Sequence, residues 1–192
     1  MSPILAWPNK RIKITTKRFL IETLRPQMVN STILGWMQQP PIAKQFPDLG
    51  RQSDIESLRS HFASMASERK CYFLTKVKDS DEAIGFLIAE FGPGRSMTTH
   101  HALGDRRWWG KGVVHETRGG FIEGMFRAGV HKVIGIPRAS SRSAIQTYKD
   151  QGFVQEGILR DRYLNEDGTY EDGIVFGLLQ SDWNYKIAIQ AR

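Results

Sequence analysis

Residues 109–114 read Trp-Gly-Lys-Gly-Val-Val, and this stretch says more about the fold than any other part of the chain. It lies between a predicted strand, about Ser96–Leu103, and a predicted helix that begins at Val113 and runs to about Ala128. Glycines let the backbone approach a ligand closely, and a helix start presents unpaired N–H groups at the positive end of its dipole. The stretch therefore predicts a diphosphate-binding loop, although a tight strand-to-helix turn explains the same glycines equally well.

The segments on either side of this loop alternate between strand and helix patterns. Upstream, the sequence predicts a strand at Phe19–Leu24, a helix from Pro26 to about Met37, a loop at Gln39–Gly50, a helix capped by Ser53 with Glu56, and a hairpin of 71–77 with 83–91. Downstream, it predicts a strand at 131–136, a helix at Ser141–Gln151, and a long hairpin of Phe153–Tyr163 with Tyr170–Leu179. This order indicates an α+β fold in which helices flank a mixed α/β sheet of about six or seven strands with about four helices.

Composition indicates one globular domain. The chain has 192 residues, of which 40% are hydrophobic and 24% charged, so disorder as the main state is excluded. We assign residues 1–16 to a basic N-terminal arm, 17–183 to the domain and 184–192 to a C-terminal tail. No apolar run is long enough to span a membrane, and Cys71 is the one cysteine, so neither a disulfide framework nor a multi-cysteine zinc site is expected. We expect a cytoplasmic protein with no membrane partner.

The net charge of +7 is segregated along the chain. Basic residues gather near the N-terminus and again around the glycines, at Arg106, Arg107, Lys111, Arg118, Arg127 and Lys132. Acidic residues gather near the C-terminal hairpin, at Glu156, Asp161, Glu166, Asp167, Glu171 and Asp172. The basic group beside the loop suits an anionic cofactor, and the acidic segment could attract a cationic substrate. An unevenly charged surface without function accounts for any single residue as well.

Three motifs in the C-terminal half resemble those of the GNAT N-acetyltransferase superfamily, in the branch of ribosomal-protein alanine N-acetyltransferases and spermidine acetyltransferases. WGKGVVHE at 109–116 resembles that branch's acetyl-CoA pyrophosphate loop, SRSAIQTYKDQGF at 141–153 its second motif, and residues 153–183 its closing β-hairpin. The resemblance covers residues 96–183 well and 17–95 loosely. It implies a GNAT-like acyl-CoA N-acyltransferase fold, acetyl-CoA as co-substrate without a metal, and direct acetyl transfer to a primary amine.

The resemblance also implies roles for individual residues. Backbone N–H groups of Gly110, Lys111, Gly112, Val113 and Val114 would hold the pyrophosphate beside Trp109. Ala102, Leu103 and Gly104 would pair with the pantetheine arm like an extra strand, and Ser141 stands where the family usually has a pantetheine-binding asparagine. Tyr148 stands where the family often has the tyrosine that protonates the departing thiolate. Trp109, Val114 and Ser141 depart from the family pattern without removing the backbone donors.

The attacking amine must be neutral, so a general base is needed. His100 and His101 point to opposite faces of the predicted strand, and a histidine has the side-chain pKa nearest to neutrality. Either one could be the base, although each could equally be a structural residue. Asp105 and Glu116 are weaker candidates, and Glu116 is expected to support the helix.

Two further residues have structural alternatives. Tyr148 could be a core aromatic, and Cys71 is expected to be a small buried hydrophobic residue.

Two other functions fit the same fold. The first is a CoA-binding protein without catalysis, which the departures at Val114 and Ser141 allow. The second is a basic module that binds RNA or ribosomes, for which the basic residues 10–18 speak, although no aromatic RNA-binding motif or zinc finger is present. The amine acceptor could be a protein N-terminus, a polyamine, an amino acid or an amine antibiotic. The sequence neither supports nor excludes a homodimer.

Overall fold

The computed structural model describes residues 11–67, 69–165 and 167–184. Within them, eight strands form one sheet in the order β1-β2-β3-β4-β5-β6-β8-β7. The strands are β1 Lys13–Thr15, β2 Phe19–Thr23, β3 Lys70–Val77, β4 Ala83–Gly92, β5 Ser96–Leu103, β6 Lys132–Gly135, β7 Val154–Leu164 and β8 Tyr170–Leu179. Neighbouring strands run antiparallel except β5 and β6, which run parallel. The mixed sheet and the α+β class are as predicted.

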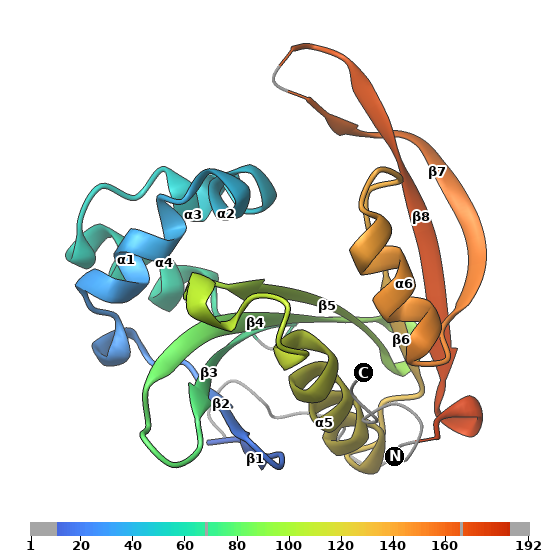
Figure 1. Ribbon diagram of the computed structural model, residues 1–192, viewed down its shortest axis with the longest axis horizontal. Helices are drawn as coiled ribbons and strands as arrows, with labels where there is room; N and C mark the ends of the chain where they lie inside the picture. Colours follow the sequence, from blue (N-terminus) through green and yellow to red (C-terminus); the bar gives the residue numbers. More distant parts are fainter. Residues whose placement is uncertain (1–10, 68, 166, 185–192) are drawn as a thin grey trace.

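Six α-helices in the described residues cover the two faces of this sheet. They are α1 Ser31–Met37, α2 Pro40–Gln45, α3 Pro47–Gly50, α4 Ile55–Met65, α5 Val113–Arg127 and α6 Arg142–Asp150. Short 3₁₀ turns lie at Pro26–Met28, Pro93–Arg95, Arg106–Trp108 and Gln180–Asp182. Figure 1 shows α1–α4 above the sheet and α5 beneath it, while the β7–β8 hairpin arches away from the sheet beside α6.

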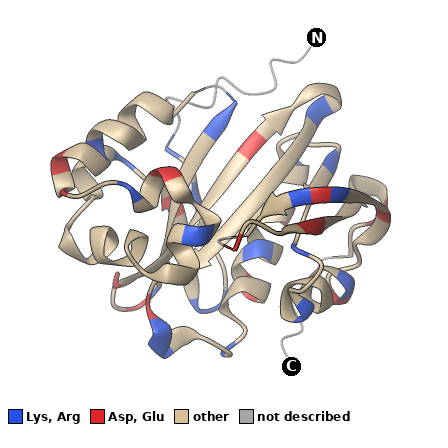
Figure 2. Ribbon diagram, turned by 90° about the horizontal axis from the view of Figure 1, so that it is seen from above, with Lys and Arg blue, Asp and Glu red and all other residues tan. Residues whose placement is uncertain are grey.

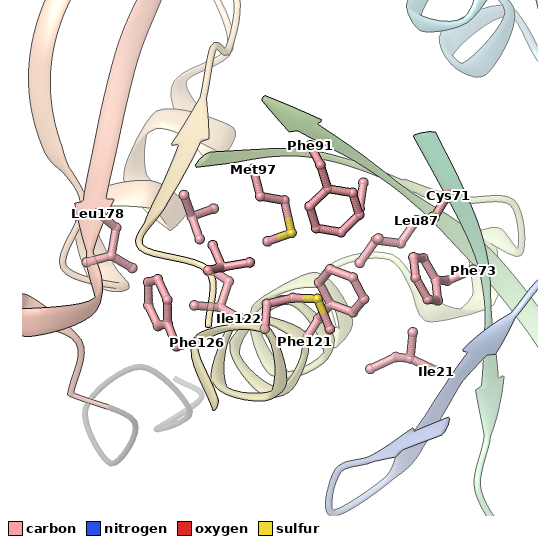
Figure 3. Close-up of a cluster of buried hydrophobic side chains, with 14 of the residues drawn as sticks. Ile21, Cys71, Phe73, Leu87, Phe91, Met97, Phe121, Ile122, Phe126 and Leu178 are labelled. Carbon is pink, nitrogen blue, oxygen red and sulfur yellow. The ribbon is translucent and has the colours of Figure 1, made fainter. Parts of the chain in front are cut away.

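Each face of the sheet has its own apolar core. On the α5 face, Phe121, Ile122 and Phe126 pack against strand residues such as Met97 and Phe73 (Figure 3). On the opposite face, α1–α4 contribute a second cluster that includes Ile33, Trp36, Ile42, Leu58 and Phe62. Alternate residues of one strand therefore serve opposite cores, which is the pattern of a sheet buried on both sides.

The parallel strands β5 and β6 separate after three paired residues. Ser96–Thr98 pair with Lys132–Ile134, whereas β5 continues to Leu103 along β4 alone. From Thr99 onward, β5 therefore has an edge that faces away from β4 without a β6 partner. A strand edge without a partner presents backbone groups that can pair with another extended chain.

The segment 39–50 is helical, so the predicted loop there is wrong. Pro40 and Pro47 each occupy the first turn of a short helix, α2 and α3. Proline suits that position because its missing N–H would have no partner there and its fixed φ matches the helix. The prolines and Gly50 of this segment predict a loop, whereas in the structure the prolines start helices.

Two helix starts also differ from the prediction. The helix expected at 26–37 is divided, because Asn30 accepts a hydrogen bond from the Ile33 amide at 3.1 Å and begins α1 after a 3₁₀ turn. The helix expected at Ser53 begins one residue later, where Asp54 accepts from the Ser57 amide at 2.8 Å and completes a capping box with Ser57. Glu56 is not part of that box.

One strand more than expected lies at the N-terminal edge. Lys13–Thr15 form β1, which pairs with β2, so the sheet begins inside the segment 1–16 assigned to an arm. The pattern was missed because its alternation is short and rich in lysine. Residues 1–10 of that arm and 185–192 of the tail lie outside the described residues.

β1 also explains why α5 contains glycines. A Cβ on Gly120 would lie 2.5 Å from Thr16 Cγ2, and one on Gly124 would lie 2.9 Å from Ile14 Cδ1. Residues 14–16 therefore lie so close to α5 that a side chain at position 120 or 124 would force Thr16 or Ile14 to shift. In the described part of the chain, no helix has the length and apolar character needed to cross a membrane.

Candidate functional site

The glycine-rich loop connects the end of β5 to the start of α5. Its backbone has positive φ at Gly110, 71°, and at Gly112, 68°. Gly112 is the N-cap of α5 in the left-handed conformation, so the following amides point out of the helix start. Residues with a side chain are strained at such φ values, which is why both positions require glycine. The loop has the backbone geometry of an anion-binding helix start.

Arg18 holds this loop against the rest of the protein. Its Nη2 donates to the Lys111 carbonyl oxygen at 3.0 Å, and its Nε donates to Glu116 Oε2 at 2.6 Å. Glu116 also accepts from the Thr16 hydroxyl at 2.7 Å and from the Arg18 amide at 2.8 Å. Burial acts to raise the pKa of Glu116, but these hydrogen bonds and the Arg18 charge outweigh it, so the pKa lies below its ordinary value. Glu116 is therefore a structural residue, as predicted.

A cavity of about 260 Å³ lies between the glycine loop, the free part of β5 and α2. Its lining residues are Pro41, Ile42, Gln45, His101, Ala102, Leu103, Trp109, Gly110 and Val114. At its rim, Trp109 Nε1 donates to the Leu103 carbonyl oxygen at 3.0 Å, and the Arg106 guanidinium stacks 5.4 Å from the Trp109 ring. The structure thus gathers the predicted strand residues and the predicted loop residues around one opening.

The remaining residues proposed for cofactor binding lie around this cavity without lining it. Val113 is buried against Phe19, so only its backbone faces the loop. Gly104 packs so closely on Trp36 that a Cβ at position 104 would lie 2.0 Å from the indole ring. The Gly104 carbonyl oxygen accepts a hydrogen bond from Gln39 Nε2 at 2.8 Å. Gly104 lines a second cavity of about 440 Å³ on the α1 side.

Lys111 and Ser141 belong to different elements of the fold. The Lys111 ammonium lies 5.6 Å from the centre of the Trp108 ring at the surface of the loop. Ser141 is the N-cap of α6, and its hydroxyl makes no capping hydrogen bond there. Ser141 therefore belongs to the start of α6, and Lys111 to the loop before α5.

Tyr148 lies on α6 and is almost completely buried, with 7% of its surface exposed. Its ring stacks on Phe176 with centroids 5.4 Å apart, and the Arg118 guanidinium lies 4.1 Å above it. Its hydroxyl reaches the end of β6, because a Cβ on Gly135 would lie 2.5 Å from Tyr148 Oη. Tyr148 is thus a core aromatic whose polar end lies at the point where β5 and β6 separate.

His100 and His101 point to opposite faces of β5, as predicted. His101 faces α5 and lines the cavity, and burial followed by the nearby Arg118 charge lowers its pKa well below 6.5. His100 faces the α1–α4 layer, where its ring lies 6.2 Å from the Phe46 ring. Burial lowers the pKa of His100 as well, although Glu90 acts in the opposite direction. Both imidazoles are therefore neutral at neutral pH, the state that a general base requires.

The weaker candidates are engaged elsewhere. Asp105 lies 2.7 Å from Arg107 Nη2, and hydrogen bonds from Arg107 lower its pKa, which makes it a poor base. Cys71 is buried, and burial raises the pKa of its thiol to about 11, which excludes a thiolate nucleophile at neutral pH. No group of three His, Cys, Asp or Glu side chains in the described residues has the arrangement of a metal site.

The two charge clusters are less available than the sequence suggests. In the basic cluster, Arg107, Arg127 and Lys132 each form an ion pair with a carboxylate. In the acidic segment, Glu156 pairs with Lys132, Glu171 with Arg138, and Asp172 accepts from the Asp161 amide. Figure 2 shows basic and acidic bands close together along the β7–β8 hairpin. The hairpin is therefore not a uniformly acidic surface.

Several residues that shape the site escaped the sequence analysis. The sequence marks Arg18 only as one residue of a basic stretch and gives no signal for Gly135 or Gln39. No local pattern marks these residues, because each acts on a segment distant in the sequence. Pro41, Ile42 and Gln45 were missed because α2 was expected to be a loop, and the two prolines at its start were the available signal.

No protein family model matches the chain, and a search of curated proteins finds no match. Solved structures do match. A ribosomal-protein-S5-alanine acetyltransferase from Vibrio fischeri superposes with a TM-score of 0.74 at 16% identity, covering 90% of this chain and 99% of that one. A chimera of spermidine N-acetyltransferase SpeG from Vibrio cholerae and hSSAT superposes with a TM-score of 0.74 at 18% identity, covering 86% of this chain and 97% of that one.

Mycobacterium smegmatis RimJ, solved in complex with CoA-disulfide, superposes with a TM-score of 0.71 at 18% identity, covering 90% of this chain and 88% of that one. Acetyltransferases described as members of the GNAT family from Bacillus anthracis and Chromobacterium violaceum superpose with TM-scores of 0.74 and 0.75. These structures are under 25% identical to the chain, so the likeness is one of fold. The chain has the fold of the GNAT acetyltransferases, the family that its three motifs resemble.

Proposed function

We propose that the protein is an N-acetyltransferase that transfers the acetyl group of acetyl-CoA directly to a primary amine. The observation that carries this proposal is the free edge of β5, which begins where β6 diverges and ends beside the positive-φ glycines of the loop. An extended chain that ends in a diphosphate matches this arrangement, because the strand edge supplies backbone partners and the helix start supplies anion-binding amides.

The donor would lie along this edge. Backbone amides from Gly110 to Val114 would bind the pyrophosphate, and Ala102–Gly104 would pair with the pantetheine arm. The Leu103 carbonyl oxygen accepts from Trp109 Nε1, and its second lone pair would be the one that accepts from a pantetheine amide. Ser141 would contact the arm from the α6 side.

The transfer needs one proton acceptor and one proton donor. The neutral amine attacks the thioester carbonyl carbon, the C–N bond forms as the C–S bond breaks, and the sulfur leaves as a thiolate. Tyr148, whose hydroxyl lies at the divergence of β5 and β6, would protonate that thiolate. His100 would take the proton that the amine loses, directly or through water. Cys71 is too basic and too buried to carry an acyl group, which favours direct transfer.

His100 is a better candidate for the base than His101 because of the elements that surround it. Phe46, which precedes α3, lies against its ring, and the charges that act on it come from Glu90, Lys70 and Arg162. Arg162 belongs to β7, so the α1–α4 layer and the β7–β8 hairpin both reach the His100 side of β5. An amine acceptor would enter between the α1–α4 layer and the β7–β8 hairpin.

The acceptor class is proposed only as a primary amine. Two of the matching structures are named for a ribosomal-protein alanine and for spermidine, which are different kinds of amine. The ion pairs and hydrogen bonds that occupy Glu156, Glu171 and Asp172 weaken the argument for a polycation at the hairpin. A protein N-terminus, a polyamine, an amino acid and an amine antibiotic all have the required group.

The test is amine-dependent release of CoA thiol from acetyl-CoA. Purified protein is offered spermidine, a peptide with an N-terminal alanine, single amino acids and an aminoglycoside, and the product is identified by mass. We expect one amine to release thiol in a one-to-one ratio with its N-acetyl derivative. Binding of acetyl-CoA without release by any amine would instead support a CoA-binding protein without catalysis.

A further inference from the structure

Three buried polar atoms lack a hydrogen-bond partner where β5 and β6 diverge. They are Thr99 Oγ1, His101 Nε2 and Arg118 Nη2, and they are unpartnered within the part of the chain that the structure describes. Thr99 and His101 lie two residues apart on β5 and share the face of Met97, which packs into the α5 core. A buried polar group without a partner is costly, so three together call for an explanation.

Arg118 is the most unusual of the three. Its side chain projects from α5, only 4% of the residue is exposed, and no carboxylate among the described residues pairs with it. Its Nε donates to Gln151 Oε1 at 2.5 Å, and Gln151 is itself fixed because its Nε2 donates to the His115 carbonyl oxygen at 2.7 Å. The guanidinium is thus held above the Tyr148 ring, and the Tyr148 side chain is the one group in the described part of the chain that acts to keep its charge against burial. By geometry, Nη2 still has no hydrogen-bond partner among the described residues.

This unpaired charge lies next to the proposed reaction centre. Val114 lines the donor cavity, and Arg118 follows it by one turn on the same face of α5. His101 lines the same cavity and lies close enough to Arg118 for the guanidinium charge to act on it. The ring centre of Tyr148, the proposed proton donor, lies 4.1 Å from the central carbon of the guanidinium. Arg118 itself does not line the cavity, but its unpartnered Nη2 lies directly behind residues that do, on the side of Tyr148.

We propose that Arg118, with Thr99 and His101, binds a carboxylate carried by one of the two substrates. A guanidinium forms short, charge-assisted hydrogen bonds with a carboxylate, and the Thr99 hydroxyl and a neutral His101 N–H are further donors. The carboxylate belongs either to the acyl group, as in the thioester of a dicarboxylic acid, or to the acceptor, as in an amino acid. This inference rests on the proposed function, whose donor it specifies further.

The acyl arm of the test compares succinyl-CoA with butyryl-CoA, which has the same chain length without the charge, and with acetyl-CoA. The acceptor arm uses acetyl-CoA with an amino acid and with its carboxamide. We expect wild-type protein to prefer the carboxylate in one arm by at least about tenfold in kcat/KM, the factor that a hydrogen bond to a charged group typically contributes. Arg118→Met should abolish that preference, because methionine fills similar space without a charge.

Arg127→Met is the matched control, since Arg127 lies on the same helix with its side chain 78% exposed. It should leave the preference unchanged. Thermal unfolding and acetyl-CoA binding of Arg118→Met verify that the variant is folded. Thr99→Val offers a second, milder variant that should weaken the same preference if Arg118→Met fails to fold.

Three results would overturn the inference. Wild-type protein that binds and uses acetyl-CoA but shows no preference for a carboxylate in either arm would leave the proposed function standing and remove this one. An equal loss of kcat on all substrates in Arg118→Met would assign Arg118 to the transfer step itself. Failure of every CoA thioester to bind wild-type protein would overturn the proposed function and this inference together.

Discussion

At the scale of single residues, Tyr148 shows how far a motif determines a role. The motif places it on α6, but its hydroxyl reaches β6 only because residue 135 is glycine, and its ring is fixed by Phe176 and Arg118. The sequence predicted the tyrosine and not these three neighbours, which come from other elements. A spacing rule describes one element, whereas the position of a side chain depends on several.

Tyr148→Phe tests the proposed role of the hydroxyl. The ring would keep its stacking on Phe176, so the fold and the binding of acetyl-CoA should change little. We expect kcat to fall by about a hundredfold or more, since a positioned acid contributes that much to a proton transfer. Steady-state kinetics with a binding measurement separate the two effects, and an unchanged kcat would show that another group protonates the thiolate.

His100 determines the pH dependence that we expect. Burial lowers its pKa below the ordinary 6.5, so the neutral base is present at neutral pH and is lost as pH falls through the lowered pKa. The ionisation of the free amine makes kcat/KM rise with pH, and loss of the neutral base should add a steeper acid limb below about pH 6.5. His100→Gln should lack this acid limb at a lower overall kcat/KM, whereas His131→Gln, at an exposed position, should keep it. An acid limb that persists in His100→Gln would exclude His100 as the base.

At the scale of elements, two helical glycines differ in their surroundings. Gly35 lies in α1 with open space at its Cβ position, whereas Gly120 lies in α5 against the Thr16 methyl at 2.5 Å. We expect Gly35→Ala to stabilise the protein by up to about 1 kcal/mol, because alanine favours the helix. Gly120→Ala should destabilise it by about 1–3 kcal/mol, because β1 must move. Chemical denaturation measures both, and a stable Gly120→Ala would mean that β1 does not pack closely on α5.

Glu116 connects α5 to the β1–β2 turn, and this contact should stabilise the fold. Glu116→Gln removes the charge that binds Arg18 and should lower the free energy of unfolding by about 2 kcal/mol at pH 7. The folded-state pKa of Glu116 lies below 4.5, so this stabilisation is present above pH 4.5 and disappears as pH falls through the lowered value. The exposed pair of Glu56 supplies the control, since Glu56→Gln should change stability by less than about 1 kcal/mol. If the loss of unfolding free energy in Glu116→Gln stays constant down to pH 3, this account is contradicted.

The elements themselves could largely be predicted from periodicity and turn residues. The boundaries of Ser96–Leu103 and Tyr170–Leu179 are as predicted, because turn residues mark them: Pro93-Gly94 and Gly104 flank the first strand, and Gly168 lies just before the second. The prediction of a loop at 39–50 is wrong because proline, which ends many helices, also occupies the first turn of others. β1 was missed because three residues are too few for a period to appear.

At the scale of the whole molecule, the arrangement of the sheet explains why one loop motif was not sufficient evidence. The glycines of 109–114 fit a plain turn until β5 and β6 are seen to separate beside them. The point where β5 and β6 diverge brings together residues more than thirty positions apart in the sequence, such as Thr99 and Gly135. No local sequence pattern predicts this arrangement. The motifs predicted the fold by resemblance, and the free edge of β5 gives a physical reason for the function that we propose.

The most direct measurement is a thermal-unfolding titration with acetyl-CoA, with ATP and NAD as phosphate-bearing controls. A ligand at about a hundred times its Kd stabilises the native state by roughly 2.7 kcal/mol, which appears as a clear rise in Tm. We expect acetyl-CoA to raise Tm and the two controls to leave it nearly unchanged, because only acetyl-CoA has a pantetheine arm for the edge of β5. No shift with acetyl-CoA, or an equal shift with all three ligands, would contradict the account.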